Sequence, residues 1–376
     1  MKKQSPVKNH RVSLTLPAII FAILFIFAAA SCTHLPRPVE NIGQSSEFLD
    51  GGKNQPGAKD RARHTLTGKR PFEWWYFDGH LDSGETFVGV FFDPNFTNGK
   101  PGATFSLYSP DWKKMSVLQS LQAEEMKSST EDVQIACPLG FVRRMDDKQY
   151  HVRWNMEGVT ADFKLTMTAP GWMLDGQDES RDFFWSIHQA RNRIEGAITQ
   201  NGQTRQVKGE GYADHNWGRK PLNEITRDWV WGRIFSDEYT IVYADVDYID
   251  PAMNRARPLY IARGDKIIVG AASPTVRQRD FATHPVLKRH YPKQVLIDFE
   301  EGGVGAHLNI RFKALVEEVD LLTVAGLNPF SQWIARTFIA RPVYFRIIAD
   351  YQGDIIEHGK ATPIAGECLY EIMGFE

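Results

Sequence analysis

The sequence predicts an all-β protein made of two antiparallel barrels in tandem. Its 376 residues include 10 Trp, 12 Tyr and 23 Phe, and many of these rings stand beside Val, Ile or Thr, which favours strands over helices. Short segments alternate between apolar and polar residues, as half-buried strands do. The same pattern returns in the second half of the chain, so we expect an internal duplication with its boundary near Pro221.

The strands expected in the first half follow from this alternation. Asp82-Ser83-Gly84 separates the first two of them and is a hairpin signal. Residues 113–130 fit a helix or a strand equally well. The predicted strands are 72–81, 85–92, 150–154 and 161–167.

The second half holds more strands and one helix. Turns are expected at Gly264-Asp265, at 300–303 and at 352–354. Asn328 and Pro329 suit the start of a helix, which Pro342 ends. The predicted strands are 229–235, 239–249, 259–263, 266–270, 294–299, 306–312, 342–351 and 355–361.

The N-terminus has the layout of a secretory signal. A basic stretch precedes an uncharged apolar run, 14–30, and small residues then lead to Cys32. We expect a signal peptide over 1–31 that ends at a lipidated Cys32; an uncleaved membrane anchor is the alternative. The polar segment 32–63 is predicted to be a tether. Two barrel domains should follow, 64–220 and 221–376.

The net charge, the few cysteines and the absence of several motifs argue against several classes of protein. The net charge of −2, about −6 once the signal is removed, gives no basic field for nucleic acid. Cys137 and Cys368 could form a disulfide but fit two unpaired core thiols better. The sequence contains no Gly-x-Ser-x-Gly, His-Glu-x-x-His, Cys-x-x-Cys or phosphate-binding loop. We therefore expect no cofactor and no metal ion.

Two segments carry the candidate catalytic residues. Residues 211–218 read Gly-Tyr-Ala-Asp-His-Asn-Trp-Gly, and 241–247 read Ile-Val-Tyr-Ala-Asp-Val-Asp. If both are strands, His215 and Trp217 share one face, and so do Tyr243 and Asp245. An acid, a basic ring and two aromatic faces could then meet in one apolar cavity.

Each of these candidates also has a structural interpretation. His215 can hold the junction between the domains by hydrogen bonds, and Trp217 and Tyr243 can be core residues. Asp245 is in an apolar strand, where an unpaired carboxylate is costly. It could pair with one of the arginines nearby in the sequence, Arg227, Arg233 or Arg263.

Three further aromatic residues are candidates for binding a ligand: Trp75, Tyr76 and Trp231. Trp75 and Tyr76 are expected to plug a barrel end or to line its cavity. Trp231 shares a face with Trp229 and Arg233, so a pocket mouth and cross-strand packing both fit.

Four segments resemble a two-domain, lipocalin-like family that includes the acyclic carotenoid 1,2-hydratases, also called hydroxyneurosporene synthases. Many secreted proteins and, more distantly, fungal pericyclases belong to it. The segments are Glu73-Trp74-Trp75-Tyr76-Phe77-x-Gly-x-Leu, Gly211-Tyr212-x-Asp214-His215-Asn216-Trp217-Gly218, Tyr243-x-Asp245, and Arg341-Pro342-Val343-Tyr344-Phe345 with a later Gly-Glu.

The resemblance implies roles for the candidate residues. Asp245 would protonate a trisubstituted alkene, Trp217 and Tyr243 would stabilise the resulting cation, and His215 would deprotonate the incoming water. The expected function is a cofactor-independent hydratase, a carbon–oxygen lyase, acting on an apolar isoprenoid such as a carotenoid. A non-catalytic carrier of lipophilic molecules is the alternative, followed by a pericyclase-like isomerase, and whether the chain is an enzyme stays open.

The expected partners are an apolar small molecule and a membrane, the latter through the lipid on Cys32. The lipoprotein is predicted to face the periplasm from the outer membrane. No nucleic-acid partner is expected.

Overall fold

The computed structural model describes residues 54–173, 182–251, 255–324 and 342–375, all within one compact unit, Ser45–Glu376. The predicted signal peptide, Cys32, most of the tether and the helix expected from Asn328 lie outside the described residues. Membrane attachment therefore stays a prediction. Among the helices of the described residues, none is long and apolar enough to cross a membrane.

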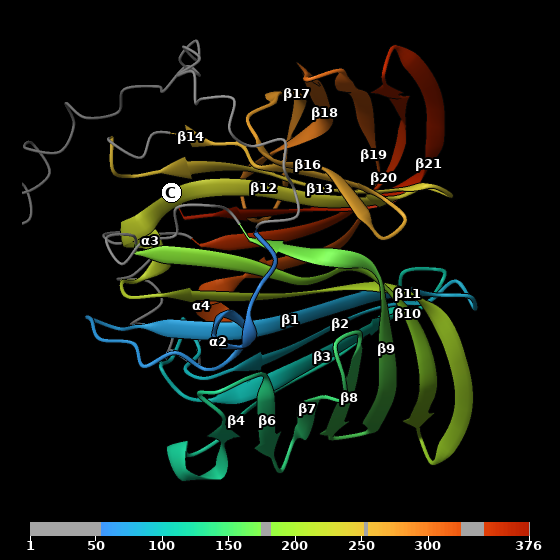
Figure 1. Ribbon diagram of the computed structural model, residues 1–376. Helices are drawn as coiled ribbons and strands as arrows, with labels where there is room; N and C mark the ends of the chain where they lie inside the picture. The colour runs from blue at the N-terminus through green and yellow to red at the C-terminus, as the bar shows by residue number, and fades with distance from the viewer. Residues whose placement is uncertain (1–53, 174–181, 252–254, 325–341, 376) are drawn as a thin grey trace, which may run out of the picture. The chain divides into compact units, whose positions relative to one another are not determined.

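The first sheet is antiparallel, and its strands lie in the order β4-β3-β2-β1-β11-β10-β9-β8-β7-β6-β5 (Figure 1). The strands are β1 Phe72–Leu81, β2 Thr86–Phe92, β3 Gly102–Tyr108, β4 Lys114–Ser120, β5 Lys127–Ser128, β6 Gln134–Cys137, β7 Gly140–Arg144, β8 Gln149–Met156, β9 Val159–Met173, β10 Phe183–Gln200 and β11 Gln203–Gly218.

The second sheet is also antiparallel, in the order β16-β15-β13-β12-β21-β20-β19-β18-β17, with β14 paired to β13. Its strands are β12 Thr226–Phe235, β13 Tyr239–Tyr248, β14 Arg255–Ala256, β15 Leu259–Arg263, β16 Lys266–Ala272, β17 Thr275–Thr283, β18 His290–Glu301, β19 Val304–Asp320, β20 Val343–Glu357 and β21 Lys360–Gly374.

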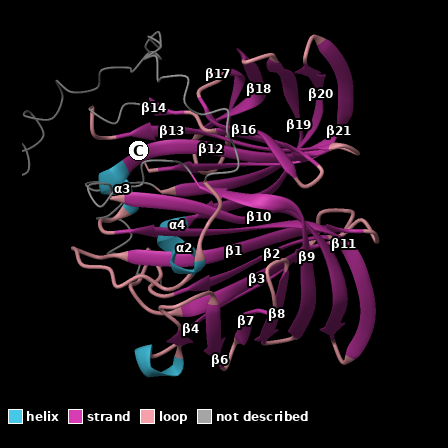
Figure 2. Cartoon of the chain, viewed as in Figure 1, coloured by secondary structure: helices cyan, strands magenta, loops and turns pink. Residues whose placement is uncertain are grey.

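The helices of the described residues are single turns, so the prediction of an all-β protein is confirmed (Figure 2). They are α2 Ala58–Arg61, the 3-10 turn η1 Ala123–Glu125, α3 Leu222–Ile225 and α4 Leu321–Val324. The ambiguous segment 113–130 forms β4, η1 and β5.

The two sheets share their connectivity. The first strand of each, β1 or β12, pairs on one side with the next strand and on the other with the last strand of that sheet. The chain passes from one sheet to the other through α3. Both sheets curl (Figure 1), and in the described residues no ladder joins β4 to β5 or β16 to β17, so each is a half-barrel. The domain limits at 64–220 and 221–376 stay predictions.

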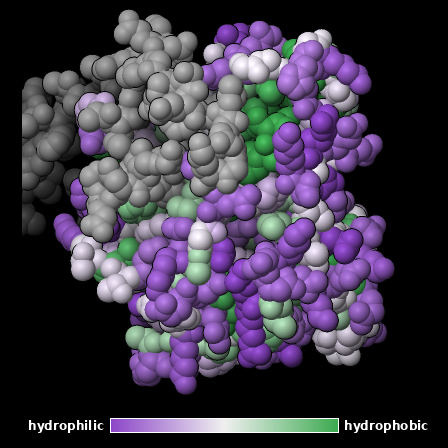
Figure 3. All heavy atoms as spheres, viewed as in Figure 1, coloured by the Kyte–Doolittle hydropathy of each residue, from purple (hydrophilic) through white to green (hydrophobic). Residues whose placement is uncertain are grey.

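Four apolar clusters of the described residues stabilise this arrangement, because alternate residues of a strand face opposite sides. The smallest lies on the face of β2 and β3 opposite to the curl and consists of Val88, Val90, Phe92 and Tyr108. One cluster fills the curl of the first sheet, around Trp154 and Phe87. A second fills the curl of the second sheet, around Tyr243 and Phe345. Figure 3 shows hydrophobic residues at the surface near β17–β19, with hydrophilic residues along one side of them. The third cluster lies between the sheets and includes Trp231.

The turn predicted at 352–354 is wrong. β20 continues through these residues to Glu357, and the turn lies at His358-Gly359, where φ is 50° and 79°. Gly353 is required within the strand because a Cβ there would lie 1.9 Å from the carbonyl oxygen of His307 on β19. A glycine that permits close backbone approach was thus mistaken for a turn residue.

Candidate functional site

Strands β1 and β11 carry polar residues on both of their faces. Their register pairs Trp75 with His215 and Tyr76 with Asp214. Because residues alternate, Trp75 and His215 point into the curl of the first sheet, whereas Tyr76 and Asp214 point toward the second sheet. Two distinct polar clusters therefore lie back to back across this strand pair.

The cluster inside the first sheet consists of Glu73, His64 and His215, and we call it the Glu73 cluster. Glu73 Oε1 lies 2.8 Å from His64 Nδ1 and 2.9 Å from His215 Nε2. The side chains of Glu73 and His215 are fully buried, and that of His64 is 24% exposed. The other ring nitrogen of His215, Nδ1, lies 3.0 Å from the carbonyl oxygen of Asp60.

Aromatic rings enclose the Glu73 cluster. Trp75 stacks on His215 with ring centroids 4.5 Å apart, and Trp217 stacks on His64 at 3.9 Å. Burial lowers the pKa of His215, although Glu73 opposes this effect. Burial alone would raise the pKa of Glu73, but its contacts with His215 and His64 outweigh burial and lower that pKa. The neutral imidazole is therefore favoured at His215.

The cluster between the sheets joins Tyr76 and Asp78 of β1 to Arg233, Arg346 and Glu371 of the second sheet, and we call it the interface cluster. Arg233 Nε donates to Asp78 Oδ1 at 2.7 Å. Tyr76 OH contacts Asp78 Oδ2 at 3.0 Å and Glu371 Oε1 at 2.8 Å, and Arg346 bonds to Glu371. Burial raises the pKa of Glu371 even though Arg346 opposes it.

Asp214 lies on the same face as the interface cluster. Its Oδ2 accepts hydrogen bonds from Trp185 Nε1 at 2.8 Å and Tyr212 OH at 2.9 Å, and Asn216 Nδ2 donates to Oδ1 at 2.8 Å. Burial raises the pKa of Asp214 to about 8 although these donors oppose it, and the charge of Glu371 raises it further. Asp214 thus holds a proton near neutral pH.

Half-buried aromatic rings line the same space between the sheets. Trp74 packs on Phe96 with centroids 5.5 Å apart and on Phe183 at 6.4 Å, and Phe183 stacks on Trp229 at 6.2 Å. These rings stay partly accessible. These rings belong to the same apolar cluster as the aromatic residues that hydrogen-bond to Asp214 and Glu371.

Asp245 is held by ion pairs. Arg255 Nε lies 2.6 Å and Arg257 Nε 3.1 Å from its Oδ1, and Gln278 Nε2 donates to Oδ2 at 2.8 Å. None of the three arginines weighed from the sequence is its partner: they pair instead with Asp247, Asp78 and Glu357.

The structure does not bring the four predicted catalytic residues together. His215 and Trp217 lie inside the first sheet, and Tyr243 lies inside the second. As predicted, His215 shares a strand face with Trp217, and Tyr243 shares one with Asp245. The first pair, however, points into the first half-barrel and the second pair into the second. Of the described contacts of Asp245, none is to His215 or Trp217.

The predicted ligand-binding residues are divided in the same way. Trp75 lies inside the first sheet, where its Nε1 donates to the carbonyl of Arg61 at 3.0 Å. Tyr76 and Trp231 both lie between the sheets, with ring centroids 5.8 Å apart in an edge-to-face arrangement. The sequence signal that distinguishes them is the alternation of inner and outer residues.

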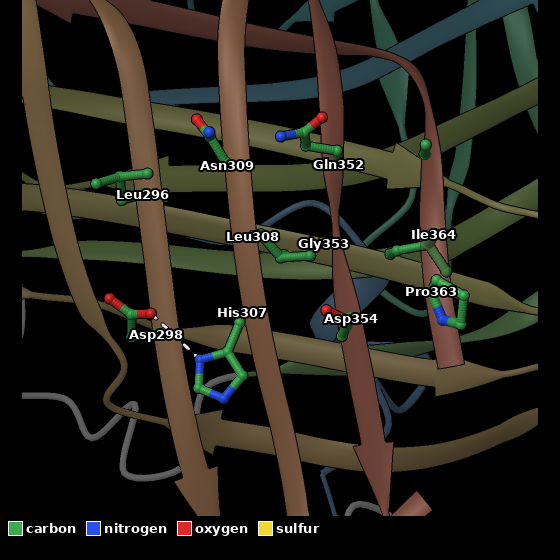
Figure 4. Close-up of a pocket in the computed structure, with 11 residues that line it drawn as sticks. Leu296, Asp298, His307, Leu308, Asn309, Gln352, Gly353, Asp354, Pro363 and Ile364 are labelled. Atoms are coloured by element: carbon green, nitrogen blue, oxygen red, sulfur yellow. Dashed lines mark hydrogen bonds and ion pairs between the residues drawn. The ribbon is translucent and has the colours of Figure 1, made fainter. Parts of the chain in front are cut away.

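The cavities among the described residues include two that none of the predicted site residues lines. The larger, about 580 Å³, is a groove on the outer face of β18–β21, where His307 lies 3.2 Å from Asp298 (Figure 4). The smaller, about 60 Å³, is lined by His188, Arg61 and Tyr150. Neither cavity is lined by Asp214 or Glu371.

Sequence reasoning assigned no role to Glu73, Asp214, Arg346 or Glu371. Glu73 and Asp214 are both within the segments that carry the family resemblance. The missed signal was a charged residue inside an apolar strand, such as Arg346 in Tyr-Phe-Arg-Ile-Ile and Glu371 in Leu-Tyr-Glu-Ile-Met. Such residues need buried partners.

Comparisons with known proteins agree with the motifs. The family model of the carotenoid hydratase CrtC matches residues 156–280, which include Asp214, His215 and Asp245. No curated protein matches the chain. The resemblance to the two-domain hydratase family that the motifs predicted is thus confirmed over this matched segment.

Three solved structures share the fold over most of the chain. An AttH-like protein from Nitrosomonas europaea is 17% identical, with a TM-score of 0.61 over 88% of this chain and 99% of its own. CghA with Sch210972 is 12% identical, with a TM-score of 0.59 over 85% and 97%. Kievitone hydratase from Nectria haematococca is 15% identical, with a TM-score of 0.56 over 87% and 97%. At these identities the likeness shows the fold alone.

Proposed function

We propose that this chain, which resembles the carotenoid hydratases in its sequence over residues 156–280, is a hydratase-like enzyme that adds water to an apolar, isoprenoid-like alkene. The observation that carries the proposal is Asp214. Burial raises its pKa to about 8, so it is an acid that is still protonated at neutral pH beside an aromatic surface. A neutral carboxylic acid is what protonation of an unactivated double bond requires.

The proposed reaction divides the work between two carboxyl groups. Asp214 transfers its proton to one alkene carbon, and a tertiary carbocation forms at the other. Water attacks that carbon through its oxygen, and Glu371 takes the proton that the water loses. The product is a tertiary alcohol, and the cycle is completed when Glu371 releases its proton to solvent and Asp214 takes one up from solvent. General acid and base groups of this kind typically contribute about 10²- to 10⁴-fold each.

The cation would be stabilised by ring faces near Asp214. The ring centroid of Trp231 lies 5.1 Å from that of Tyr212 and 5.8 Å from that of Tyr76. The Tyr212 hydroxyl donates to Asp214, and the Tyr76 hydroxyl contacts Glu371. An aromatic face can stabilise a desolvated cation by about 2 kcal/mol. These rings therefore take the role that the resemblance gave to Trp217 and Tyr243.

The half-buried rings of Trp74, Phe96, Phe183 and Trp229 indicate the substrate class. They offer an apolar, polarisable surface with few hydrogen-bonding groups, which suits a long polyene. We therefore propose an acyclic isoprenoid, as the name of the matched family suggests.

The test is hydration in water labelled with ¹⁸O. Purified protein is incubated with an acyclic carotenoid such as neurosporene in detergent, and the extract is analysed by mass spectrometry. We expect a product heavier by one labelled water, and a loss of at least about 100-fold in its rate with Asp214→Asn. Asp245→Asn is the matched control, and its folded fraction should keep the wild-type rate.

Each other outcome points to a different function. Unreduced turnover with Asp214→Asn would remove this residue as the acid. A product of unchanged mass would favour an isomerase. Bound carotenoid without any product would favour a carrier, for which the outer groove of about 580 Å³ is in the size range of ligand sites. In that case binding should weaken when a bulky residue replaces Ala365 in the groove.

A further inference from the structure

The Glu73 cluster lies on the face of β1 and β11 opposite to Asp214, and the proposed hydration does not use it. We propose that Glu73, His64 and His215 bind one divalent transition-metal ion, with Zn²⁺ as the best fit. This inference goes beyond the proposed function and does not depend on it.

The first support is the convergence of ligand atoms. One oxygen of Glu73 and one ring nitrogen from each histidine all lie within 4.8 Å of one another. Two histidines and a glutamate form a recurrent zinc ligand set, with metal–ligand lengths of about 2.0–2.2 Å and so a tetrahedral separation of roughly 3.3–3.5 Å. The observed gaps of 2.8 and 2.9 Å need to open by only about half an ångström.

The second support is the hydrogen-bonding of His215. Its Nδ1 faces the carbonyl oxygen of Asp60 at 3.0 Å, and its Nε2 faces Glu73 Oε1 at 2.9 Å. Both neighbours are acceptors, but a neutral imidazole has a single N–H. If Nδ1 donates to the carbonyl, the lone pair of Nε2 points at a carboxylate oxygen. A cation placed between them satisfies both.

The third support is the way these ligands are held. A ring N–H given to a backbone carbonyl fixes the orientation of a metal-binding histidine, and Asp60 does this for His215. The backbone of Glu73 is fixed by pairing with Trp217. His64 is on the segment before β1, where it can shift by the distance required. Its 24% exposed side chain also gives an ion access from solvent.

A fourth donor is within reach. His188 is 5% exposed, neither of its ring nitrogens has a hydrogen-bond partner among the described residues, and its ring centroid lies 5.5 Å from that of His215. It also lines the cavity of about 60 Å³, which has room for a water molecule. Either His188 or this water can complete four-coordination.

The consequence is a clamp on the N-terminal segment. The ligand His64 and the supporting residue Asp60 come before β1, Glu73 is on β1, and His215 is on β11, the last strand of the first sheet in chain order. No short sequence motif therefore contains all three ligands. An ion bound here fixes the segment around α2 to the middle of the sheet. Ligands this far apart in the sequence form no recognisable zinc motif.

The test is metal binding by the full chain, purified without a histidine tag and stripped with a chelator. We expect one Zn²⁺ per chain by elemental mass spectrometry, a visible Co²⁺ spectrum typical of nitrogen and oxygen ligands, and a Tm that rises with Zn²⁺. His64→Ala and Glu73→Gln should each weaken Zn²⁺ binding by at least about 100-fold. Because His64 is partly exposed and outside the strands, His64→Ala should still fold.

His307→Ala is the matched control. Its ring also contacts two carboxylates, Asp298 at 3.2 Å and Glu300 at 3.0 Å, but through opposite nitrogens that cannot chelate one ion. This variant should bind Zn²⁺ as the wild type does, and so should Asp214→Asn, which separates the metal site from the hydration site. Less than about 0.1 ion per wild-type chain, or unchanged binding by His64→Ala, would overturn the proposal and leave a hydrogen-bonded structural cluster.

Discussion

The protonation of Asp214 makes a prediction about stability that needs no substrate. The pKa of this carboxyl rises in the folded protein from an ordinary 3.8 to about 8. Between these two pH values the folded state keeps a proton that the unfolded state releases. The stabilisation is therefore complete below about pH 4 and is lost as the pH rises toward 8.

The size of the effect follows from the same values. Each pH unit in this window costs about 1.4 kcal/mol of folding free energy for one group, so the change from pH 5 to pH 7 costs about 2.7 kcal/mol. Asp214→Asn removes the titrating group and with it this share of the pH dependence. The amide keeps a similar shape and can still accept hydrogen bonds from Trp185 and Tyr212.

The assay is urea unfolding of wild type and variant at pH 5 and at pH 7, followed by tryptophan fluorescence. Asp132→Asn is the control: burial raises the pKa of Asp132, but the hydrogen bond from Arg61 helps to bring it below its ordinary value. Asp132 is therefore ionised in both states across this range, and its loss should leave the difference between the two pH values unchanged.

One result would refute the reasoning. If wild type and Asp214→Asn lose the same stability from pH 5 to pH 7, Asp214 is already a carboxylate in the folded protein. The three donors Trp185, Tyr212 and Asn216 would then have outweighed burial, as hydrogen bonds to a carboxylate can. The orientation of the Asn216 amide affects which form of Asp214 is favoured. Its NH2 group donates to a carboxylate, whereas after a half-turn its oxygen accepts the proton of a neutral carboxylic acid.

Three further predictions concern stability. Asp245→Asn leaves two arginines without their carboxylate and should cost about 3–5 kcal/mol in urea unfolding, while hydration per folded molecule is kept. Arg346→Met leaves Glu371 buried beside no cation, and we expect a loss of similar size together with a pH dependence that shifts as Glu371 takes up a proton. Gly89→Ala places a Cβ 2.2 Å from the Trp154 ring and should lower the free energy of unfolding by about 1–3 kcal/mol, seen as a lower Tm.

The strands could be predicted from the sequence because their signal is local. The alternation of Tyr150, Val152 and Trp154 lies within a single element, and the structure has a strand there, β8. The error at Gly353 arose because its cause is not local: the carbonyl of His307 on the neighbouring strand is 46 residues away in the sequence. A turn and a close strand crossing both select glycine, and only the strand pairing distinguishes them.

The site was harder to predict because it depends on which strands, distant in the sequence, lie next to each other in the fold. The sequence indicated correctly that Tyr243 and Asp245 share a face, but the partners of Asp245 come from β14 and the segment after it, and from β17. Arg255 and Arg257, the ion-pair partners of Asp245, lie in a segment where the sequence predicts no strand. A buried carboxylate requires a partner, yet this rule does not say which arginine supplies it.

Asp214 and His215 are neighbours in the sequence but lie in different environments. Neighbours on a strand face opposite sides, so Asp214 cannot act as the partner of His215. The same opposition directs His215 into the first half-barrel, where it meets Glu73, and directs Asp214 to the space between the sheets. There it lies among the rings of Trp185 and Tyr212 and within the field of Glu371. If both proposals hold, this single motif supplies two chemically different sites, and substitutions at Asp214 and His215 should separate hydration from metal binding.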